Sequence, residues 1–344
     1  MATTRGEPVP MREIVGDAIR APSAHNVQPA RWAFRRADAR VALLRDPARS
    51  LPVADPTSRD EAASLGAALE GFAIAASTRG LAVHGLVRNE EAARAFGANV
   101  VGGFDVVATF HLADGVSPDP LAPCVDRRRA WRGQFGPADE AEGAIARFAD
   151  AANAHDAMIL GRELAPRIAT LIDRATWRFE RRADYHAELW EWLRLDPRDP
   201  RYRRDGLTAE ALLLSAPARA AGRVLMRPTV FRVLQATGLG RHLVSERAAT
   251  ESAACFICHC SPADRAPFDV GRGMYRLWLA ATAAGLVLAP MSAIVDDADT
   301  RVIVEQALGL DAIRRLTQVF RAGTIRGEPP RSPRLPVEEM FVEL

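Results

Sequence analysis

Two stretches of the chain match each other at an offset of 205 residues, and this repeat constrains the fold more than any other feature. Residues 66–81 read GAALEGFAIAASTRGL and residues 271–286 read GRGMYRLWLAATAAGL, so that Gly66 aligns with Gly271. Both stretches have the apolar spacing of a helix, end at a glycine and contain small residues that let another helix approach closely. The repeat predicts two halves built on one plan within a single polypeptide.

A second match keeps the same order of elements. The sequence APSAHN at 21–26 resembles AANAHD at 151–156, at an offset of 130. The two offsets differ by 75, so the second half is expected to carry about that many extra residues between its matched elements. We therefore expect an insertion somewhere between residues 157 and 270.

The repeat also sets the expected domain boundaries and fold class. We expect a first half at 1–122 and a second half at 123–344, with the insertion at about 180–253. Alternation of apolar and polar residues predicts strands at 106–112 and 254–260 and a hairpin near 31–46. Helices mixed with strands in no regular alternation indicate an α+β fold.

The expected insertion has a basic amphipathic sequence. Apolar residues at helical spacing alternate with arginines at five positions: Arg219, Arg223, Arg227, Arg232 and Arg241. Such a pattern is compatible with a helix on a membrane surface. We favour a helical flap on the protein's own body, because surface helices normally pack on their parent core.

None of the 45 basic residues is a lysine, and this absence excludes several mechanisms. A lysine is required for a Schiff base, for a pyridoxal phosphate anchor and for a phosphate-binding loop. A formal net charge of +2, with no long basic run, argues against nucleic acid as a partner. Any bound anion must therefore be held by arginine forks, hydroxyl groups and backbone amides.

The sequence gives no indication of a membrane or an export route. No stretch approaches the ~20 apolar residues of a membrane helix, and the polar start MATTRGEPVP lacks the apolar block of a secretory signal. We expect a cytoplasmic protein without a membrane partner, and cysteines that stay reduced.

The segment APSAHNVQPARWAF at 21–34 lines up short polar side chains after a predicted helix. These side chains are Ser23, His25, Asn26 and Gln28. They have the donors and acceptors to bind a flat heteroaromatic ring along its edge. The same residue types also satisfy the backbone of an ordinary loop, and local physics alone leaves both alternatives open.

Arginines are concentrated in DRRRAWRGQF at 126–135. We expect Arg128 and Arg132 to lie one helical turn apart, where their guanidinium groups would close on one anion. An arginine run is also typical of a solvated face.

These motifs together resemble a known family. The run PSxHNxQP followed by an aromatic strand resembles the flavin-contacting segment of the nitroreductase superfamily, and especially its Acg-like branch of fused, internally duplicated proteins. The sequence RRAWR is similar to the RRSxR start of nitroreductase units, which grips the FMN phosphate. This chain departs from the pattern at Ala30, where the family has tryptophan, and at Ala130, where it often has serine.

The resemblance extends to the C-terminal third. In the family, an arginine before a proline in the closing segment returns to the phosphate; Arg334 is the matching position and Arg331 a nearby candidate. The segment GLVLAPMS resembles the loop that passes the reactive edge of the flavin. There, main-chain amides near Pro290, Met291 and Ser292 would contact the ring.

The resemblance implies a monomeric pseudo-dimer that binds FMN under a helical lid, with a further homodimer left open. Ring-contacting residues survive only in the first half and arginines only in the second, so one FMN per chain is expected. Hydride would pass from transient NAD(P)H through flavin to a nitro compound, a quinone or a similar small-molecule acceptor. Two alternatives remain: a protein that sequesters FMN with little turnover, and a specialised flavin dehydrogenase.

A competing motif lies at 255–259, where Cys-Phe-Ile-Cys-His matches the pattern of covalent haem attachment. With Cys260 added, a metal site is also conceivable. Alternate strand residues point to opposite faces, however, so we expect core cysteines and no metal. No GxGxxG follows a strand, and no Ser-His-Asp or paired-carboxylate pattern is found, so no side chain is assigned a catalytic role.

Overall fold

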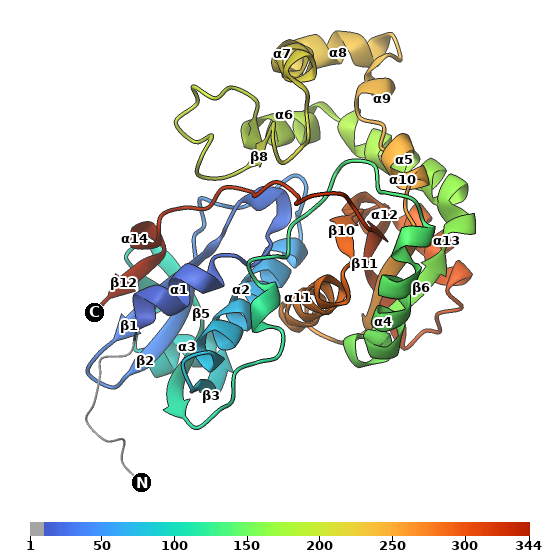
Figure 1. Ribbon diagram of the computed structural model, residues 1–344. Helices are drawn as coiled ribbons and strands as arrows, with labels where there is room; N and C mark the ends of the chain where they lie inside the picture. The colour runs from blue at the N-terminus through green and yellow to red at the C-terminus, as the bar shows by residue number, and fades with distance from the viewer. Residues whose placement is uncertain (1–9) are drawn as a thin grey trace.

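The computed structural model describes residues 10–344 and contains two main β-sheets, each covered by helices (Figure 1). The first sheet has six strands in the order β12-β1-β2-β5-β3, with β4 paired to β5. Its strands are β1 (Ala30–Arg35), β2 (Arg40–Arg45), β3 (Leu81–Arg88), β4 (Val100–Val101), β5 (Phe104–Asp114) and β12 (Phe341–Glu343). The hairpin predicted near 31–46 and the strand predicted at 106–112 are confirmed.

The second sheet has four strands in the order β10-β11-β9-β6, all antiparallel. Its strands are β6 (Ala157–Gly161), β9 (Cys255–Pro262), β10 (Val287–Pro290) and β11 (Arg314–Gly323). The strand predicted at 254–260 is confirmed as β9. Helices surround both sheets, as the mixed α and β content of the sequence predicted.

The two sheets share one strand order. Read across the sheets, the order is β1-β2-β5-β3 in the first and β6-β9-β11-β10 in the second. With the short β4 left aside, each sheet thus places its first, second, fourth and third strand of the chain side by side in that order. The helices recur in the same positions: α1 (Met11–Ala18) and α4 (Glu142–Ala152) precede the first strand of each sheet, and α2 (Arg59–Ser77) and α11 (Pro267–Ala284) follow the second.

Helices α2 and α11 cross in close contact through the two repeat glycines. An ideal Cβ placed on Gly66 would lie 1.8 Å from the carbonyl oxygen of Phe268, and one on Gly271 would lie 1.9 Å from that of Ala63. Each glycine therefore meets the backbone three residues before the other glycine. No residue with a side chain fits at either position without moving one helix.

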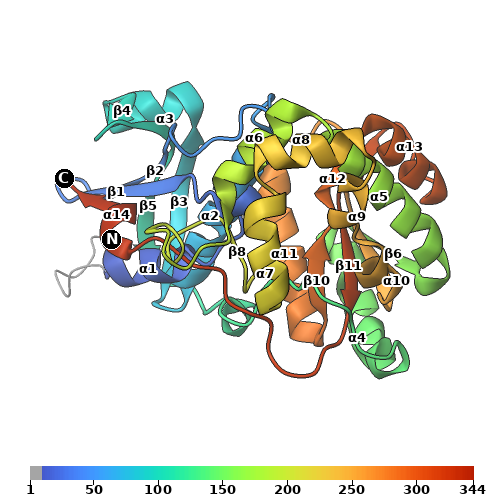
Figure 2. The same ribbon diagram turned by 90° about the horizontal axis from the view of Figure 1, so that it is seen from above.

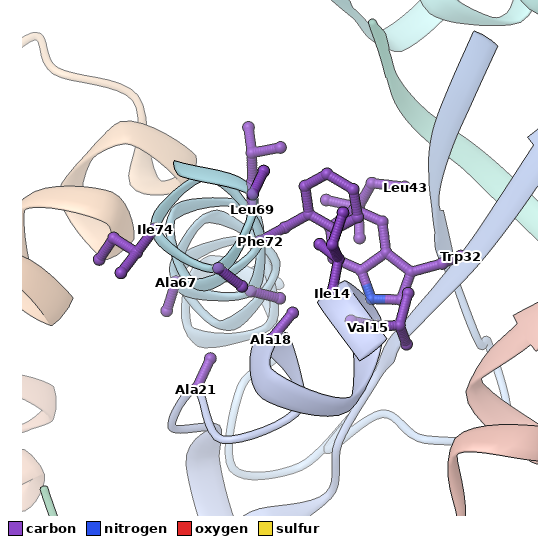
Figure 3. Close-up of a cluster of buried hydrophobic side chains, with 14 of the residues drawn as sticks. Ile14, Val15, Ala18, Ala21, Trp32, Leu43, Ala67, Leu69, Phe72 and Ile74 are labelled. Carbon is purple, nitrogen blue, oxygen red and sulfur yellow. The ribbon is translucent and has the colours of Figure 1, made fainter. Parts of the chain in front are cut away.

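The core of the first half is built around α2 and the hairpin (Figure 3). The indole of Trp32 stacks on Phe72 with ring centroids 4.5 Å apart, and Ile14 and Val15 of α1 close the cluster. Tyr275 and Leu279 of α11 belong to the same core, so the two halves share buried surface. The opposite face of the sheet packs against α3 (Asn89–Phe96).

The core of the second half lies on both faces of its sheet. Cys255 and Ile257 pack toward α4 and α11, whereas Cys258 and Cys260 pack toward the helices of the other face. Those helices are α5 (Ala165–Glu180), α12 (Ser292–Asp296) and α13 (Ala298–Ala307). All four cysteines are buried and free, which fits residues of an apolar core.

The extra residues of the second half lie between β6 and β9, where the first half has only the hairpin turn. After α5 they form five helices and a two-stranded sheet: α6 (Ala183–Trp192), β7 (Leu193–Arg194), β8 (Leu207–Thr208), α7 (Ala216–Leu225), α8 (Pro228–Ala236), α9 (Gly240–Leu243) and α10 (Arg247–Glu251). This insertion lies on the protein's own body (Figures 1 and 2). For example, Glu188 accepts hydrogen bonds from the amides of Val53 and Ala54 in the first half.

The C-terminal segment returns from the second sheet to the first. After β11 it runs back across the molecule (Figure 1), forms α14 (Val337–Met340) and adds β12 parallel to β1. The last residues of the expected second half thus complete the sheet of the first half. Within residues 10–344, no helix combines the length and apolarity that crossing a membrane requires.

The helix crossing generates a stability prediction. Gly66→Ala and Gly271→Ala should each lower the free energy of unfolding by about 2 kcal/mol or more, because the new methyl group must displace a backbone carbonyl. Gly143→Ala is the matched control: Gly143 is an exposed helical glycine whose added Cβ would come no nearer than 3.5 Å, to an Arg147 guanidinium nitrogen. Urea unfolding of the three variants checks this, and equal midpoints would refute the close crossing.

Candidate cofactor site

The cofactor cavity lies between the halves and is lined by seven residues that the sequence singled out. They are Ser23, Asn26, Arg128, Arg132, Pro290, Arg331 and Arg334. Ser23 and Asn26 come from the first half and the other five from the second. The loop after α1, the segment before α4, the end of β10 and the C-terminal segment therefore meet at one place, although they are far apart in the sequence.

Three arginines at this cavity, Arg128, Arg132 and Arg334, form what we term the arginine cluster. Arg128 is buried and the other two are half-buried, and none of the three makes a salt bridge with a carboxylate of residues 10–344. Burial lowers the pKa of Arg128 and Arg132. Burial, together with the nearby Arg128 and Arg20, lowers the pKa of Arg334 to about 9. Unpaired cations held together in a low-dielectric site favour a bound anion.

Buried hydrogen-bond donors without partners surround the same cluster. Within the described part of the chain, Nε of Arg128, the indole nitrogen of Trp278 and the hydroxyl of Tyr275 have no hydrogen-bond partner. The guanidinium carbon of Arg128 lies 4.6 Å from the centre of the Trp278 ring. Buried polar atoms are rarely left unpaired, so this group of donors points to a ligand with several acceptor atoms.

Sequence reasoning missed two aromatic residues beside Arg128: Trp278, which lines the cavity, and Tyr275, which lies behind it. Tyr275 and Trp278 lie on α11 three residues apart, inside the repeat, where they read as ordinary core aromatics. The signal was their polar tips on a helix otherwise rich in small residues, since a buried Tyr hydroxyl or Trp nitrogen normally needs a partner.

The expected helix around Arg128 and Arg132 is wrong. Residues 126–137 form no helix; Ala130 makes a bridge to Leu288, and the amide of Trp131 donates to the Leu288 carbonyl at 3.0 Å. Pairing with β10 replaces the helical turn, and Gly133 disfavours a helix there as well. The two arginines still reach the same cavity from an extended segment.

The loop at residues 25–28 has a strained backbone. His25, Asn26 and Gln28 have φ of 43°, 57° and 56°, which are left-handed values that residues other than glycine rarely adopt. Each such residue costs on the order of 1 kcal/mol. Strain of this kind persists only where surrounding contacts hold the backbone in place, and it is concentrated at functional sites.

Asn26 and Gln28 supply those contacts. The Asn26 amide nitrogen donates to Gly206 and Pro333, and its oxygen accepts from Arg334 at 2.9 Å. The Gln28 amide nitrogen donates to Arg204 at 2.9 Å, and its oxygen accepts from the amide of Leu335. Both side chains thus join the loop to the insertion and to the C-terminal segment. Gln28 does not line the cofactor cavity.

The loop after β10 reaches the site differently from the sequence expectation. Pro290 has no amide hydrogen, and the amide of Met291 donates to Val319 at 2.8 Å, so neither supplies a free donor. The Met291 side chain is buried in the core of the second half. Ser292 and His25 line the adjoining larger cavity, which also includes Ser23, Arg132 and Pro290.

His25 is a neutral side chain at this junction. Burial, and secondarily the charge of Arg132, lowers its pKa to about 4. Its Nδ1 atom is buried and has no partner among residues 10–344. At neutral pH it therefore offers one nitrogen as a donor or an acceptor to a bound group, without a charge.

The two C-terminal arginines differ. Arg331 is exposed, and its guanidinium pairs with Asp126 at 2.6 Å. Arg334 instead donates to the carbonyl of Ile19 at 2.6 Å and to Asn26. Arg334 is therefore the one of these two arginines that belongs to the arginine cluster, and the charge of Arg331 is already compensated.

In the equivalent region of the other half, the three arginines Arg265, Arg272 and Arg276 are paired with carboxylates. Glu70, which aligns with Tyr275, accepts from Arg272 and Arg276 at 2.9 Å each. Asp119 pairs with Arg276 at 2.8 Å, and Asp156, which aligns with Asn26, pairs with Arg265. Carboxylates of the chain itself neutralise this region.

Comparisons with known proteins give limited further information. No family model matches the chain, and no curated protein matches it. Among solved structures, a nitroreductase-like family protein from Bacillus cereus has a TM-score of 0.33 and 13% identity, over 64% of this chain and 94% of that chain. The FMN-dependent nitroreductase NfnB from Mycobacterium smegmatis, solved with NADPH, has a TM-score of 0.33 and 19% identity, over 62% and 95%. At these scores the similarity carries no argument about function, so the proposal below rests on the site's own residues.

Proposed function

We propose that this protein binds one FMN between its halves and uses it as an oxidoreductase. The observation that carries the proposal is that, among residues 10–344, the arginine cluster has no carboxylate partners and lies beside three buried donors without hydrogen-bond partners. A phosphate dianion supplies both the negative charge and the acceptor atoms that this site lacks. Ser23 and His25 of the first half and Pro290 of the second half provide an uncharged surface for a ring.

The residues divide the work of binding. Arg128, Arg132 and Arg334 would hold the phosphate, with Trp278 as an additional donor. Ser23, His25 and Ser292 would lie along the ring. Asn26 and Gln28 position the strained loop, because their own amide groups are occupied by the insertion and the C-terminal segment. When bound, FMN supplies hydride transfer to and from a second substrate.

We infer that the two halves are degenerate copies of one nitroreductase-like unit, fused as an intramolecular pseudo-dimer. The shared strand order, the equivalent helices and the reciprocal glycine contacts support this inference. Two equivalent sites would then have existed. One of these sites keeps the arginine cluster. In the other, Glu70 and Asp119 form salt bridges with Arg272 and Arg276.

The acceptor would be a nitro compound, a quinone or a similar molecule, with NAD(P)H as a transient reductant. Steady-state oxidation of NADH and NADPH with menadione or a nitroaromatic tests turnover directly. Flavin absorbance in the purified protein without such turnover would favour sequestration of FMN beneath the insertion. Absence of any FMN binding after incubation with excess FMN would refute the proposal as a whole.

Loss of one guanidinium tests the role of the arginine cluster. Arg132→Met should weaken FMN binding about tenfold to a hundredfold, equivalent to ~1.5–3 kcal/mol, because a charge-assisted contact to a dianion is lost. The FMN-free protein should keep its stability to within about 1 kcal/mol, since the Arg132 guanidinium makes only a 3.5 Å contact with Ala211. Fluorescence titration with FMN and urea unfolding measure the two quantities.

The matched control is Arg272→Met on the equivalent side of the molecule. Arg272 is an arginine already paired with Glu70, so its loss should leave FMN affinity unchanged. If Arg132→Met and Arg272→Met affected FMN equally, or neither did, the phosphate assignment would be wrong.

The stoichiometry of flavin binding tests the difference between the two halves. We expect one FMN per chain, because in one of the two equivalent regions Glu70 and Asp119 already pair with the arginines. Release of flavin from saturated protein, quantified against protein concentration by amino-acid analysis, gives the ratio. Two flavins per chain would contradict the role given to Glu70 and Asp119.

A further inference from the structure

The largest cavity of the site, here called the apolar chamber, has a volume of about 810 Å³ and lies between the insertion and the body. The insertion covers this side of the molecule (Figure 2). It contributes the apolar lining, including Leu189, Leu193, Leu212, Leu214 and Leu225. The chamber shares Ser23, Arg132 and Pro290 with the cofactor cavity. It is thus the space from which a second molecule would reach the cofactor.

One side of the chamber is acidic. Asp55 and Asp60 of the first half and Asp296 of the second line it, and we call these three residues the acidic wall. Asp60 and Asp296 share a single cation, Arg59, which contacts Asp60 at 2.7 Å and also contacts Asp296. Asp55 accepts from the amide of Glu61 at 2.8 Å and makes no salt bridge with the described residues.

The acidic wall is short of positive charge. Three carboxylates face one guanidinium, whereas the other acids of the chamber have their own partners: Glu180 pairs with His186 at 2.7 Å, and Glu246 pairs with Arg321 at 2.5 Å. Burial, followed by the repulsion from Asp60, raises the pKa of Asp296 to about 7. Burial also raises the pKa of Asp55. A cation near these groups would relieve both effects.

We propose that the apolar chamber binds a largely apolar acceptor of the proposed kind that carries an alkylammonium end, and that the acidic wall holds that end. The proposal rests on the proposed function, since it names the second substrate of the same site. The apolar part of the substrate fits the leucine lining, and the volume of the chamber is within the range of small-molecule sites. Tyr185 also lines the chamber, and aromatic rings attract cations.

Three dansyl probes that share one fluorophore test this directly. Dansylcadaverine has an ammonium end, dansyl-butylamide is neutral and dansyl-aminohexanoate has a carboxylate end. We expect dansylcadaverine to bind about tenfold or more tightly than the neutral probe, and the anionic probe to bind weakest. Isothermal titration calorimetry and dansyl fluorescence measure binding to the full-length protein, with FMN and after FMN removal, so the result does not depend on turnover.

Variants locate the preference within the chamber. The double variant Asp60→Asn with Asp296→Asn should abolish the preference for the ammonium probe and keep binding of the neutral probe. Asp299→Asn is the control, because Asp299 is exposed and pairs with Arg174 and Arg178 outside the chamber. Leu212→Trp should fill the chamber and weaken all three probes.

The outcomes separate the two proposals. Equal affinity for all probes, or an ammonium preference that survives the double variant, would overturn the acidic-wall proposal even in a protein that binds FMN. Ammonium preference in a protein that does not bind FMN would leave the chamber in place and refute the flavin assignment. Far-UV circular dichroism of each variant verifies that it is folded.

Discussion

The close crossing of α2 and α11 is the contact on which the rest of the structure depends. At Gly66 and Gly271 each helix reaches the backbone of the other, and the two glycines therefore hold the helices at a short separation. That separation places Tyr275 and Trp278 of α11 beside segments of the first half. The cofactor cavity is the space that remains at the side of this crossing, and it therefore requires residues from both halves.

The site is marked by charges that the protein does not balance itself. On one side, the arginine cluster has no carboxylate partners in the described part of the chain, and on the other, Asp60 and Asp296 of the acidic wall share Arg59. Burial, followed by the nearby like charges, lowers the pKa of Arg334 and raises the pKa of Asp296. Holding like charges together out of water costs stability. Elsewhere, as at Glu70 with Arg272 and Arg276, equivalent charges are paired. The unpaired groups are thus the ones available to ligands.

The sequence predicted the strands and the repeat helices because hydrophobic periodicity reports burial locally. The sequence also indicated that Arg128, Arg132 and Arg334 lie close together, and all three line one cavity. It wrongly predicted a helical turn between Arg128 and Arg132, because the pairing of this segment with β10 is a tertiary contact. The sequence suggested that Gln28 contacts the ligand, whereas the side-chain amide of Gln28 donates to the Arg204 carbonyl and accepts from the amide of Leu335. The acidic wall was not predictable, because Asp55, Asp60 and Asp296 become neighbours only through the fold.

The central claim is that the arginine cluster binds the phosphate of FMN, and the most direct measurement compares FMN with riboflavin, which has the same ring and no phosphate. Titration of flavin-free protein at several salt concentrations gives both affinities. We expect FMN to bind at least about a hundredfold more tightly than riboflavin, with the difference shrinking as salt rises. Equal affinity for the two flavins at low salt would contradict the account.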